Sequence, residues 1–312
     1  MVFESVFICV HPWFSFVFAE FVVIVNRSLF CPGTYAHSDE NQFLCEILCV
    51  LCAFVVHFSM CRVEWRMKDN NGINPRVPNP QSLMKILLTN DDGFDAPGLA
   101  ILAEVVAEFA EPVIVAAGGE MSECGHRVTT KRDLLLTRRG ENRYILDGAP
   151  ADCVRIGLAQ VCPEAAIVLA GVNDGANLGV DIFLSGTVAA AREAALMGRD
   201  AIALSHYRRG DVPRDWNALA IPLRRVLKDY LERPAGHNAF WNVNFPATDD
   251  LTPETAVIEC PLDENPLPIE YARDGNRYRY QGVYSDRPRD PGSDIDICFS
   301  GHIAATKAAL FF

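Results

Sequence analysis

Short apolar runs alternate with longer segments in which apolar residues recur every three or four positions, from residue 85 to residue 231. The short runs predict strands that are buried on both faces, and the longer segments predict amphipathic helices. The predicted strands cover residues 85–90, 112–117, 166–170 and 201–205, and the predicted helices cover residues 97–109, 151–161, 187–197 and 216–231.

This alternation predicts an α/β fold, namely a doubly wound, mainly parallel and twisted sheet of the Rossmann-like type. Two strand-like runs within residues 134–146, on either side of an Arg-Arg-Gly-Glu-Asn turn, predict an inserted hairpin. After Asn238 strand and turn signals dominate, which predicts a C-terminal β-rich arm together with strands that extend the sheet. Ligands of such sheets bind at the carboxyl ends of the strands.

The first 83 residues have a different pattern. Val6–Val25 and Phe43–Met60 are mostly apolar and approach the length that spans a bilayer, but neither shows a regular period. Residues 68–83 are rich in Asn, Gly and Pro and predict a linker. We interpret residues 1–83 as an N-terminal extension outside the fold. It is either a membrane anchor, a targeting segment or, the interpretation we favour, the product of a start codon placed ahead of Met84.

Composition and net charge exclude some classes of protein and of binding partner. With 50% hydrophobic and 22% charged residues, the chain is not disordered as a whole. Lysine and arginine number 28 against 40 aspartates and glutamates, and a net charge of −12 argues against a nucleic-acid polymer as partner. Five of the 11 cysteines follow Met84 without paired spacing, which is typical of reduced thiols in a cytoplasmic protein.

Oxygen-bearing side chains follow three of the predicted strands. Asp91 and Asp92 come directly after the first strand, Ser122 follows the second, and Asn173 follows the strand at 166–170. Because the carboxyl ends of parallel strands meet at one sheet edge, we expect these four side chains to converge on one cation. Carboxylates with neutral oxygens suit Mg²⁺ or Mn²⁺. The alternative interpretation of Asp91 and Asp92 is an acidic turn that caps a helix.

The segment Ser185-Gly186-Thr187 opens a predicted helix eight residues after Asn177. Free amides at a helix start, together with two hydroxyl groups, can bind a phosphate group. An ordinary helix cap is the alternative. We favour phosphate binding because of the nearby Asn177 loop.

At this point the chain resembles the survival protein SurE family of metal-dependent 5'-nucleotidases. The matching blocks are MKILLTNDDGFDAPG (84–98), DGAPADCVRIGL (147–158), AGVNDGANLG (170–179), SGTVAAAREA (185–194) and PGSDIDICFSGHIAAT (291–306). The resemblance covers nearly all of residues 84–312 and implies a phosphatase domain there. The loop AAGGEMSECGH around Ser122 lacks the proline and the glycine after serine that are typical of the family.

The resemblance implies a site and an activity. Asp91, Asp92, Ser122 and Asn173 match the family's metal ligands, and Asn177, Ser185, Gly186 and Thr187 match its phosphate contacts. It implies one divalent ion per subunit, nucleoside monophosphates as substrates, and a homodimer or homotetramer formed partly by exchange of a C-terminal arm. Membrane contact is expected only if residues 1–83 are part of the protein.

We expect metal-assisted hydrolysis in which Asp91 or Asp92 also orients or deprotonates the attacking water. A covalent aspartyl-phosphate route is the chemical alternative, and the resemblance argues against it. A non-catalytic nucleotide-binding or stress-response module with the same fold is the functional alternative.

Two further groups of residues are open to interpretation. Cys124 and His126 lie beside Ser122 and could form a second metal site or supply a nucleophile. We favour structural or substrate-edge roles, because no partner residues stand at metal-ligand spacing. Three arginines alternate with tyrosines near residue 275, and we interpret them as a half-exposed hairpin rather than as base contacts. These residues are Tyr271, Arg273, Arg277, Tyr278, Arg279 and Tyr280.

Overall fold

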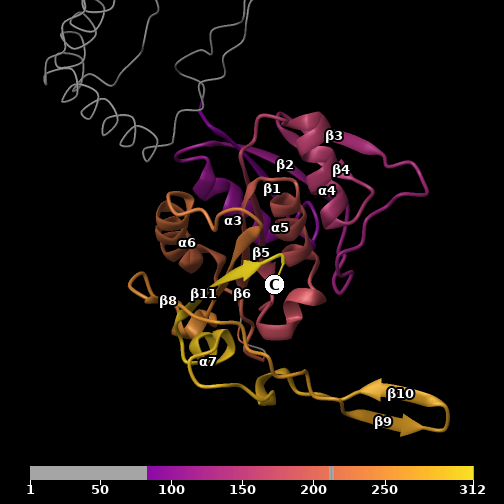
Figure 1. The fold of residues 1–312 in the computed structure, drawn as a ribbon, viewed down its shortest axis with the longest axis vertical. Helices are drawn as coiled ribbons and strands as arrows, with labels where there is room; N and C mark the ends of the chain where they lie inside the picture. The colour runs from indigo at the N-terminus through magenta and orange to yellow at the C-terminus, as the bar shows by residue number, and fades with distance from the viewer. Residues whose placement is uncertain (1–82, 211, 213, 312) are drawn as a thin grey trace, which may run out of the picture. The chain divides into compact units, whose positions relative to one another are not determined.

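A nine-stranded sheet forms the centre of the computed structural model, which describes residues 83–311 except 211 and 213 (Figure 1). The strand order is β3-β4-β2-β1-β5-β6-β7-β11-β8. The central pairs from β4 to β7 are all parallel, whereas β3 pairs antiparallel with β4 and β11 antiparallel with β7. The strands are β1 (Lys85–Thr89), β2 (Glu111–Ala117), β3 (Leu136–Gly140), β4 (Arg143–Leu146), β5 (Ile167–Asp174), β6 (Asp200–His206), β7 (Ala239–Phe245), β8 (Val257–Glu259) and β11 (Ile303–Ala309).

Helices cover both faces of this sheet, so the predicted doubly wound α/β fold is confirmed. Side chains of α3 and α6 pack on one face together with Ile86 and Leu88 of β1. Side chains of α4 and α5 pack on the other face together with Leu87, because successive residues of a strand point to opposite faces. The helices are α3 (Pro97–Val106), α4 (Pro150–Ile156), α5 (Gly186–Leu196), α6 (Trp216–Leu231) and α7 (Asp294–Phe299).

Three predicted elements differ clearly from the observed ones. The helix predicted over residues 97–109 is α3, which ends at Val106. The helix predicted over residues 151–161 is α4 followed by a π-helical turn, η1 (Gly157–Val161). A Cβ atom at Gly157 would lie 2.7 Å from Cδ2 of Leu87, so the glycine lets this turn pack directly on β1. The strand predicted over residues 166–170 continues to Asp174, which places Asn173 inside β5 rather than in a loop.

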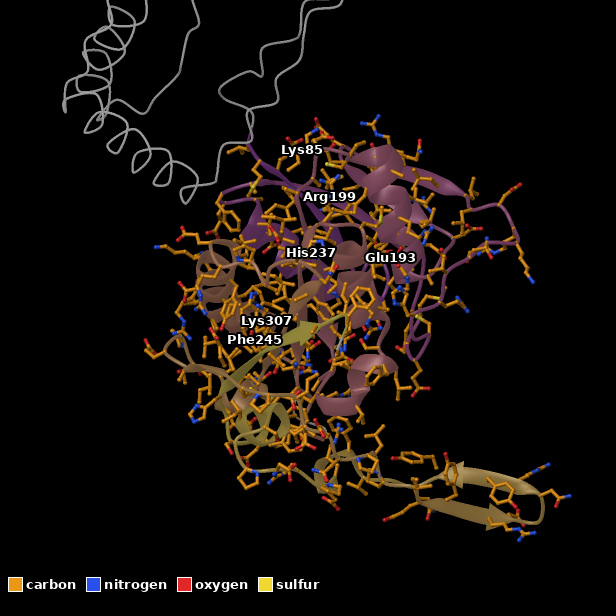
Figure 2. The ribbon with its side chains drawn as sticks, in the orientation of Figure 1. Lys85, Glu193, Arg199, His237, Phe245 and Lys307 are labelled. Atoms are coloured by element: carbon orange, nitrogen blue, oxygen red, sulfur yellow. The ribbon has the colours of Figure 1, made fainter. Side chains whose placement is uncertain are left out.

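The segment after Asn238 contains both features that its pattern predicts. β7, β11 and β8 extend the main sheet, and β9 (Tyr271–Asp274) pairs with β10 (Arg277–Tyr280) in a separate hairpin. Figures 1 and 2 show this hairpin as an arm that projects from the rest of the domain, with its side chains spread on both sides. We call residues Leu267–Tyr284, which include the hairpin, the arm.

The predicted N-terminal extension, including the apolar runs Val6–Val25 and Phe43–Met60, lies outside the described residues. Within residues 83–311, as far as they are described, no helix has the length and apolar character needed to cross a membrane.

Candidate functional site

Six of the eight predicted site residues come from distant parts of the chain and line one cavity of about 800 Å³. β1 pairs in parallel with β5, so the loop after β1 and the end of β5 meet at the same edge of the sheet. The cavity is lined by Asp91, Asp92, Ser122, Asn173, Asn177 and Ser185. The remaining two predicted residues, Gly186 and Thr187, lie directly behind Asp91 at the start of α5.

Asp91 is held against the start of α5. The Thr187 hydroxyl donates a hydrogen bond to the Asp91 carboxylate, and both residues are buried. A Cβ atom at Gly186 would lie 2.9 Å from Cβ of Asp91, so only glycine allows this approach. Burial raises the pKa of Asp91, and the hydrogen bond from Thr187 opposes the rise. Thr187 therefore positions the Asp91 carboxylate, and its hydroxyl proton is donated to that carboxylate.

Asp92 is half-buried and is fixed from the end of β5. Its Oδ2 accepts a hydrogen bond of 3.0 Å from the backbone N–H of Asp174. Burial and, second, the neighbouring charge of Asp91 raise the pKa of Asp92 to about 6. Asp174 in turn accepts 2.6 Å from Nε of Arg214, whose other nitrogens donate to the backbone carbonyl oxygens of His206 and Tyr207. Arg214 thus ties the end of β6 to the end of β5, which holds Asp92.

The side chains of Asn173 and Ser122 each donate one hydrogen bond to a nearby residue. The Asn173 amide nitrogen donates 2.8 Å to the carbonyl oxygen of Gly175, which leaves its amide oxygen as the ligand group. Ser122 is exposed, and its hydroxyl donates 2.7 Å to Glu120. A hydroxyl oxygen keeps its lone pairs when its proton is donated, so Ser122, like Asn173, can offer an oxygen atom to a cation without losing its hydrogen bond.

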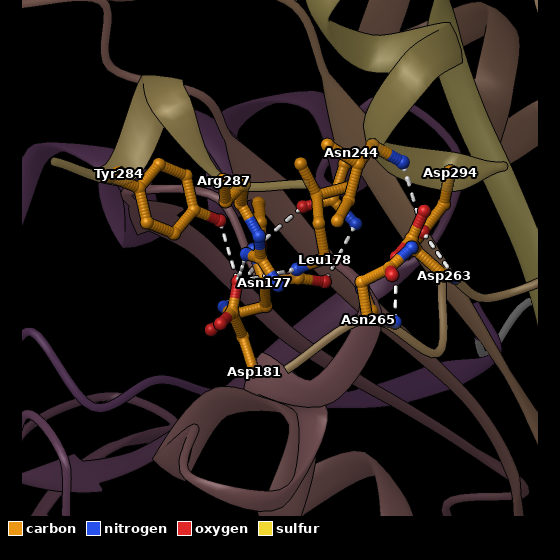
Figure 3. A network of polar contacts seen from close by, with 12 residues as sticks. Asn177, Leu178, Asp181, Asn244, Asp263, Asn265, Tyr284, Arg287 and Asp294 are labelled. Atoms are coloured by element: carbon orange, nitrogen blue, oxygen red, sulfur yellow. Dashed lines mark hydrogen bonds and ion pairs between the residues drawn. The ribbon is translucent and has the colours of Figure 1, made fainter. Parts of the chain in front are cut away.

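Asn177 lies at the centre of a buried amide network (Figure 3). Its Nδ2 donates 2.8 Å to the Ser205 hydroxyl, and its backbone carbonyl oxygen accepts from both Asn242 and Asn244. Ser185 caps α5 by accepting 3.0 Å from the backbone N–H of Val188. The helix cap that was the alternative for Ser185 is therefore present, and the same residue faces the cavity.

Sequence reasoning missed several residues of this cavity. Arg208 and Trp216 enter it from the segment after β6, whose carboxyl end lies at the same sheet edge. That position could have indicated them, because β6 was a predicted strand. Asp181 and the arm residues Tyr271, Tyr280 and Tyr284 also line the cavity, and no local pattern connects them with Asp91.

Cys124 and His126 have structural contacts. His126 Nε2 lies 2.8 Å from Glu193 of α5, and Arg155 of α4 contacts the other Glu193 oxygen at 3.0 Å. Burial raises the pKa of the Cys124 thiol, which opposes formation of the nucleophilic thiolate. Both observations agree with the structural interpretation of this loop.

The donor set around Asp91 and Asp92 fits a hard cation. In the part of the chain that the structure describes, neither carboxylate forms an ion pair with lysine or arginine, and no group of three or more His, Cys, Asp and Glu side chains could hold a metal. A soft, nitrogen- or sulfur-rich site is therefore absent from the described residues. Two carboxylates with amide and hydroxyl oxygens leave coordination positions for water and substrate, as Mg²⁺ requires.

Comparison with known proteins places the chain in a family. A family model for survival protein SurE matches residues 86–262. A protein of Synechocystis sp. is 45% identical over 224 residues, which are 72% of this chain and 99% of that protein. The 5'-nucleotidase SurE of Neisseria gonorrhoeae is 35% identical over 233 residues, 72% of this chain and 91% of that protein. The crystal structure of the SurE protein from Aquifex aeolicus matches with a TM-score of 0.64 and 28% identity, covering 73% of this chain and 94% of that one.

These matches confirm the resemblance that the sequence motifs carry. The family model spans more than half of the chain and includes Asp91, Asn173 and Ser185. The relatives align with this chain over nearly their whole length, and the same region folds as the Aquifex protein does. The chain therefore belongs to the survival protein SurE family.

Proposed function

We infer that this chain is a hydrolase of the 5'-nucleotidase class, which releases phosphate from nucleoside monophosphates. Membership of a family whose relatives are named 5'-nucleotidase SurE supports this inference. The observation that carries it is the pair Asp91 and Asp92, which form no ion pair with lysine or arginine among the described residues and share one cavity with Ser185 at the start of α5. A basic surface for a nucleic-acid polymer does not fit the net charge of −12.

We propose that Asp91, Asp92, Asn173 and Ser122 hold one divalent ion, Mg²⁺ or Mn²⁺. Such an ion supplies positive charge that polarises the substrate phosphate and acidifies the attacking water. Asp91 suits a fixed ligand, because burial and the Thr187 hydrogen bond restrict its carboxylate. Asp92 is half-buried and lines the cavity, so we propose that its carboxylate also orients the attacking water or accepts its proton.

The phosphate group is proposed to bind beside the start of α5. Ser185 and Asn177 line the cavity there, and the positive end of the α5 helix dipole favours an anion. Gly186 keeps this turn close to Asp91, so the phosphate and the carboxylates face the same small space. Holding the reacting groups in this arrangement is itself a large part of the expected rate enhancement.

Asp91→Asn tests the proposal. Without one metal-binding charge, divalent-dependent phosphate release from adenosine 5'-monophosphate should fall by about 100-fold or more, the scale seen when a charge-stabilising group is removed. Asp95→Asn, a change of the same kind at an exposed position of the same loop, is the matched control and should keep the activity. Circular dichroism of both variants checks that they fold. Unchanged turnover by a folded Asp91→Asn protein would refute the proposal.

The alternative of a non-catalytic nucleotide-binding module predicts a different result in the same assay. Such a protein would bind adenosine 5'-monophosphate but release no phosphate with Mg²⁺, Mn²⁺ or other divalent ions. Chelator should abolish the release by an enzyme and leave binding by a module unchanged.

We further propose that residues 84–312 carry this activity in the cytoplasm as a homodimer or homotetramer. All five cysteines of the described residues are free thiols, which suits a reducing compartment. Light scattering of the purified chain measures the oligomeric state, and phosphate release by residues 84–312 alone tests the domain assignment.

A further inference from the structure

The cavity has two chemically different ends. One end carries the carboxylates, Asn173 and Ser185, which the proposed chemistry uses. The other end is formed by the arm and is mainly apolar. Its lining residues are Leu267, Pro268, Ile269, Tyr271, Tyr280 and Tyr284. A phosphate and two carboxylates do not need such a surface, so it points to another part of the substrate.

Tyr271 and Tyr280 form an aromatic pair at the base of the hairpin. They are direct partners in the antiparallel ladder, and their rings pack edge to face with centroids 5.5 Å apart. Tyr271 is 56% exposed and Tyr280 is 46% exposed, and the adjacent Ile269 is 84% exposed. A group of exposed large apolar side chains inside a cavity marks a binding surface.

A buried contact fixes the arm relative to the phosphate end. Asp181 Oδ2 accepts hydrogen bonds of 2.6 Å from the Tyr284 hydroxyl and from Arg287 Nη1 (Figure 3). The Arg287 side chain is fully buried, so this ion pair is shielded from solvent and rigid. Asp181 lies on the short turn η2 (Gly179–Phe183) between Asn177 and Ser185. The arm is thus attached to the turn that connects the two proposed phosphate-binding loops.

Other aromatic residues of the hairpin do not share this position. Tyr278 is 63% exposed and lies opposite Arg273, whose guanidinium group stacks over its ring at 5.7 Å. Neither residue lines the cavity. Exposure alone therefore does not distinguish Tyr271 and Tyr280 from Tyr278, but their place at the cavity does.

We propose that Tyr271 and Tyr280 form the surface that binds the base of the nucleoside monophosphate, while its phosphate lies at the carboxylate end. This inference rests on the proposed function and adds the part of the chain that recognises the nucleoside. Planar bases stack on aromatic rings, and the two ends of one cavity match the two ends of a nucleotide. The Asp181–Tyr284–Arg287 contact sets the separation between them.

The test compares adenosine 5'-monophosphate with ribose 5-phosphate, which keeps the phosphate and sugar but lacks the base. In the full chain, the double variant Tyr271→Ala, Tyr280→Ala should lose about tenfold in kcat/KM for the nucleotide, the factor that corresponds to about 1.4 kcal/mol of lost stacking. Its kcat/KM for ribose 5-phosphate should stay within about twofold of the unchanged chain, because the stacking energy is absent there. Tyr278→Ala is the matched control and should change neither value.

A nucleotide preference that stays the same in the double variant would overturn the inference, and so would an equal loss in Tyr278→Ala. If the unchanged chain hydrolyses neither compound, the proposed function fails, and calorimetric binding of the same two compounds decides the inference by itself. A loss of the affinity difference between the two compounds in the double variant supports it. An affinity difference equal to that of the unchanged chain overturns it.

Discussion

Gly186→Ala is a single added methyl group that should damage both stability and activity. The new Cβ atom would lie 2.9 Å from Cβ and from Oδ2 of Asp91, and also 2.9 Å from Sγ of Cys124. Cβ of Asp91 cannot swing away as the end of a long side chain could. Its carboxylate is moreover held by Thr187, and both residues are buried. The strand end or the helix start must therefore move.

The sign of the effect on stability separates two physical causes. Alanine is the better helix former by up to about 1 kcal/mol, so helix propensity alone predicts that Gly186→Ala stabilises the protein. Overpacking of a buried contact costs about 1–3 kcal/mol and should exceed that gain. We expect the free energy of unfolding to fall by about 1–2 kcal/mol, the difference that these two terms leave.

The rate of phosphate release should fall by more than the loss of folding stability alone would cause. A displacement of a reacting group by about 1 Å can reduce the rate by about 100-fold, and the clash acts directly on Asp91. Urea unfolding followed by circular dichroism measures the stability, and phosphate release from adenosine 5'-monophosphate measures the activity. Gly140→Ala is the control, because its Cβ would make only ordinary contacts, 3.7 Å from Cδ of Arg143. A Gly186→Ala protein as stable and as active as Gly140→Ala would refute the close approach of α5 to Asp91.

Two predictions concern pH. Burial and, second, the charge of Arg214 lower the pKa of His206 to about 4, below its value in the unfolded chain. The resulting stability is therefore present above about pH 6.5 and is lost as the pH falls to about 4, at about 1.4 kcal/mol per unit of pKa difference, or about 3 kcal/mol in total. In urea unfolding, the free energy of unfolding of His206→Phe should lack this decrease between pH 7 and pH 4. An equal dependence of that free energy on pH in both proteins would contradict the low pKa of His206. Asp92, with its pKa of about 6, takes up a proton below that pH in the metal-free protein, so apparent Mn²⁺ affinity should fall by up to about tenfold per pH unit there. Calorimetric Mn²⁺ titrations at pH 5 and pH 7.5 measure it, and a pH-independent affinity would contradict the role of Asp92.

The central elements could be predicted because their signals are local. Leu87 is flanked by apolar residues on both sides, which predicts a strand buried on both faces, and its two neighbours indeed pack on the opposite face. The apolar face of α3 and the helix cap at Ser185 can also be predicted from residues within one or two helical turns. The π-helical turn at Gly157 was missed, and its close packing on Leu87, 70 positions away in the sequence, has no local signal.

The contacts that shape the cavity depend on residues far apart in the chain. The hydrogen bond from Thr187 to Asp91 joins residues 96 positions apart, and the contact of Arg287 with Asp181 joins residues 106 positions apart. Periodicity and residue type say nothing about such pairs, since they depend on strand order and register. For the same reason the sequence favoured an ordinary hairpin for Tyr271 and Tyr280, whereas only the folded arm places them at the cavity.

The sequence by itself determined the fold class, the family and most of the segments that line the cavity beside Asp91. These follow from the alternation of apolar and polar positions and from short motifs, which act over a few residues. Only the tertiary structure decided that Thr187 holds Asp91, that Arg214 binds Asp174 at the end of β5 and that residues of the arm line the cavity. The physical reason is that side chains distant along the chain meet only after the sheet has set the order and register of its strands.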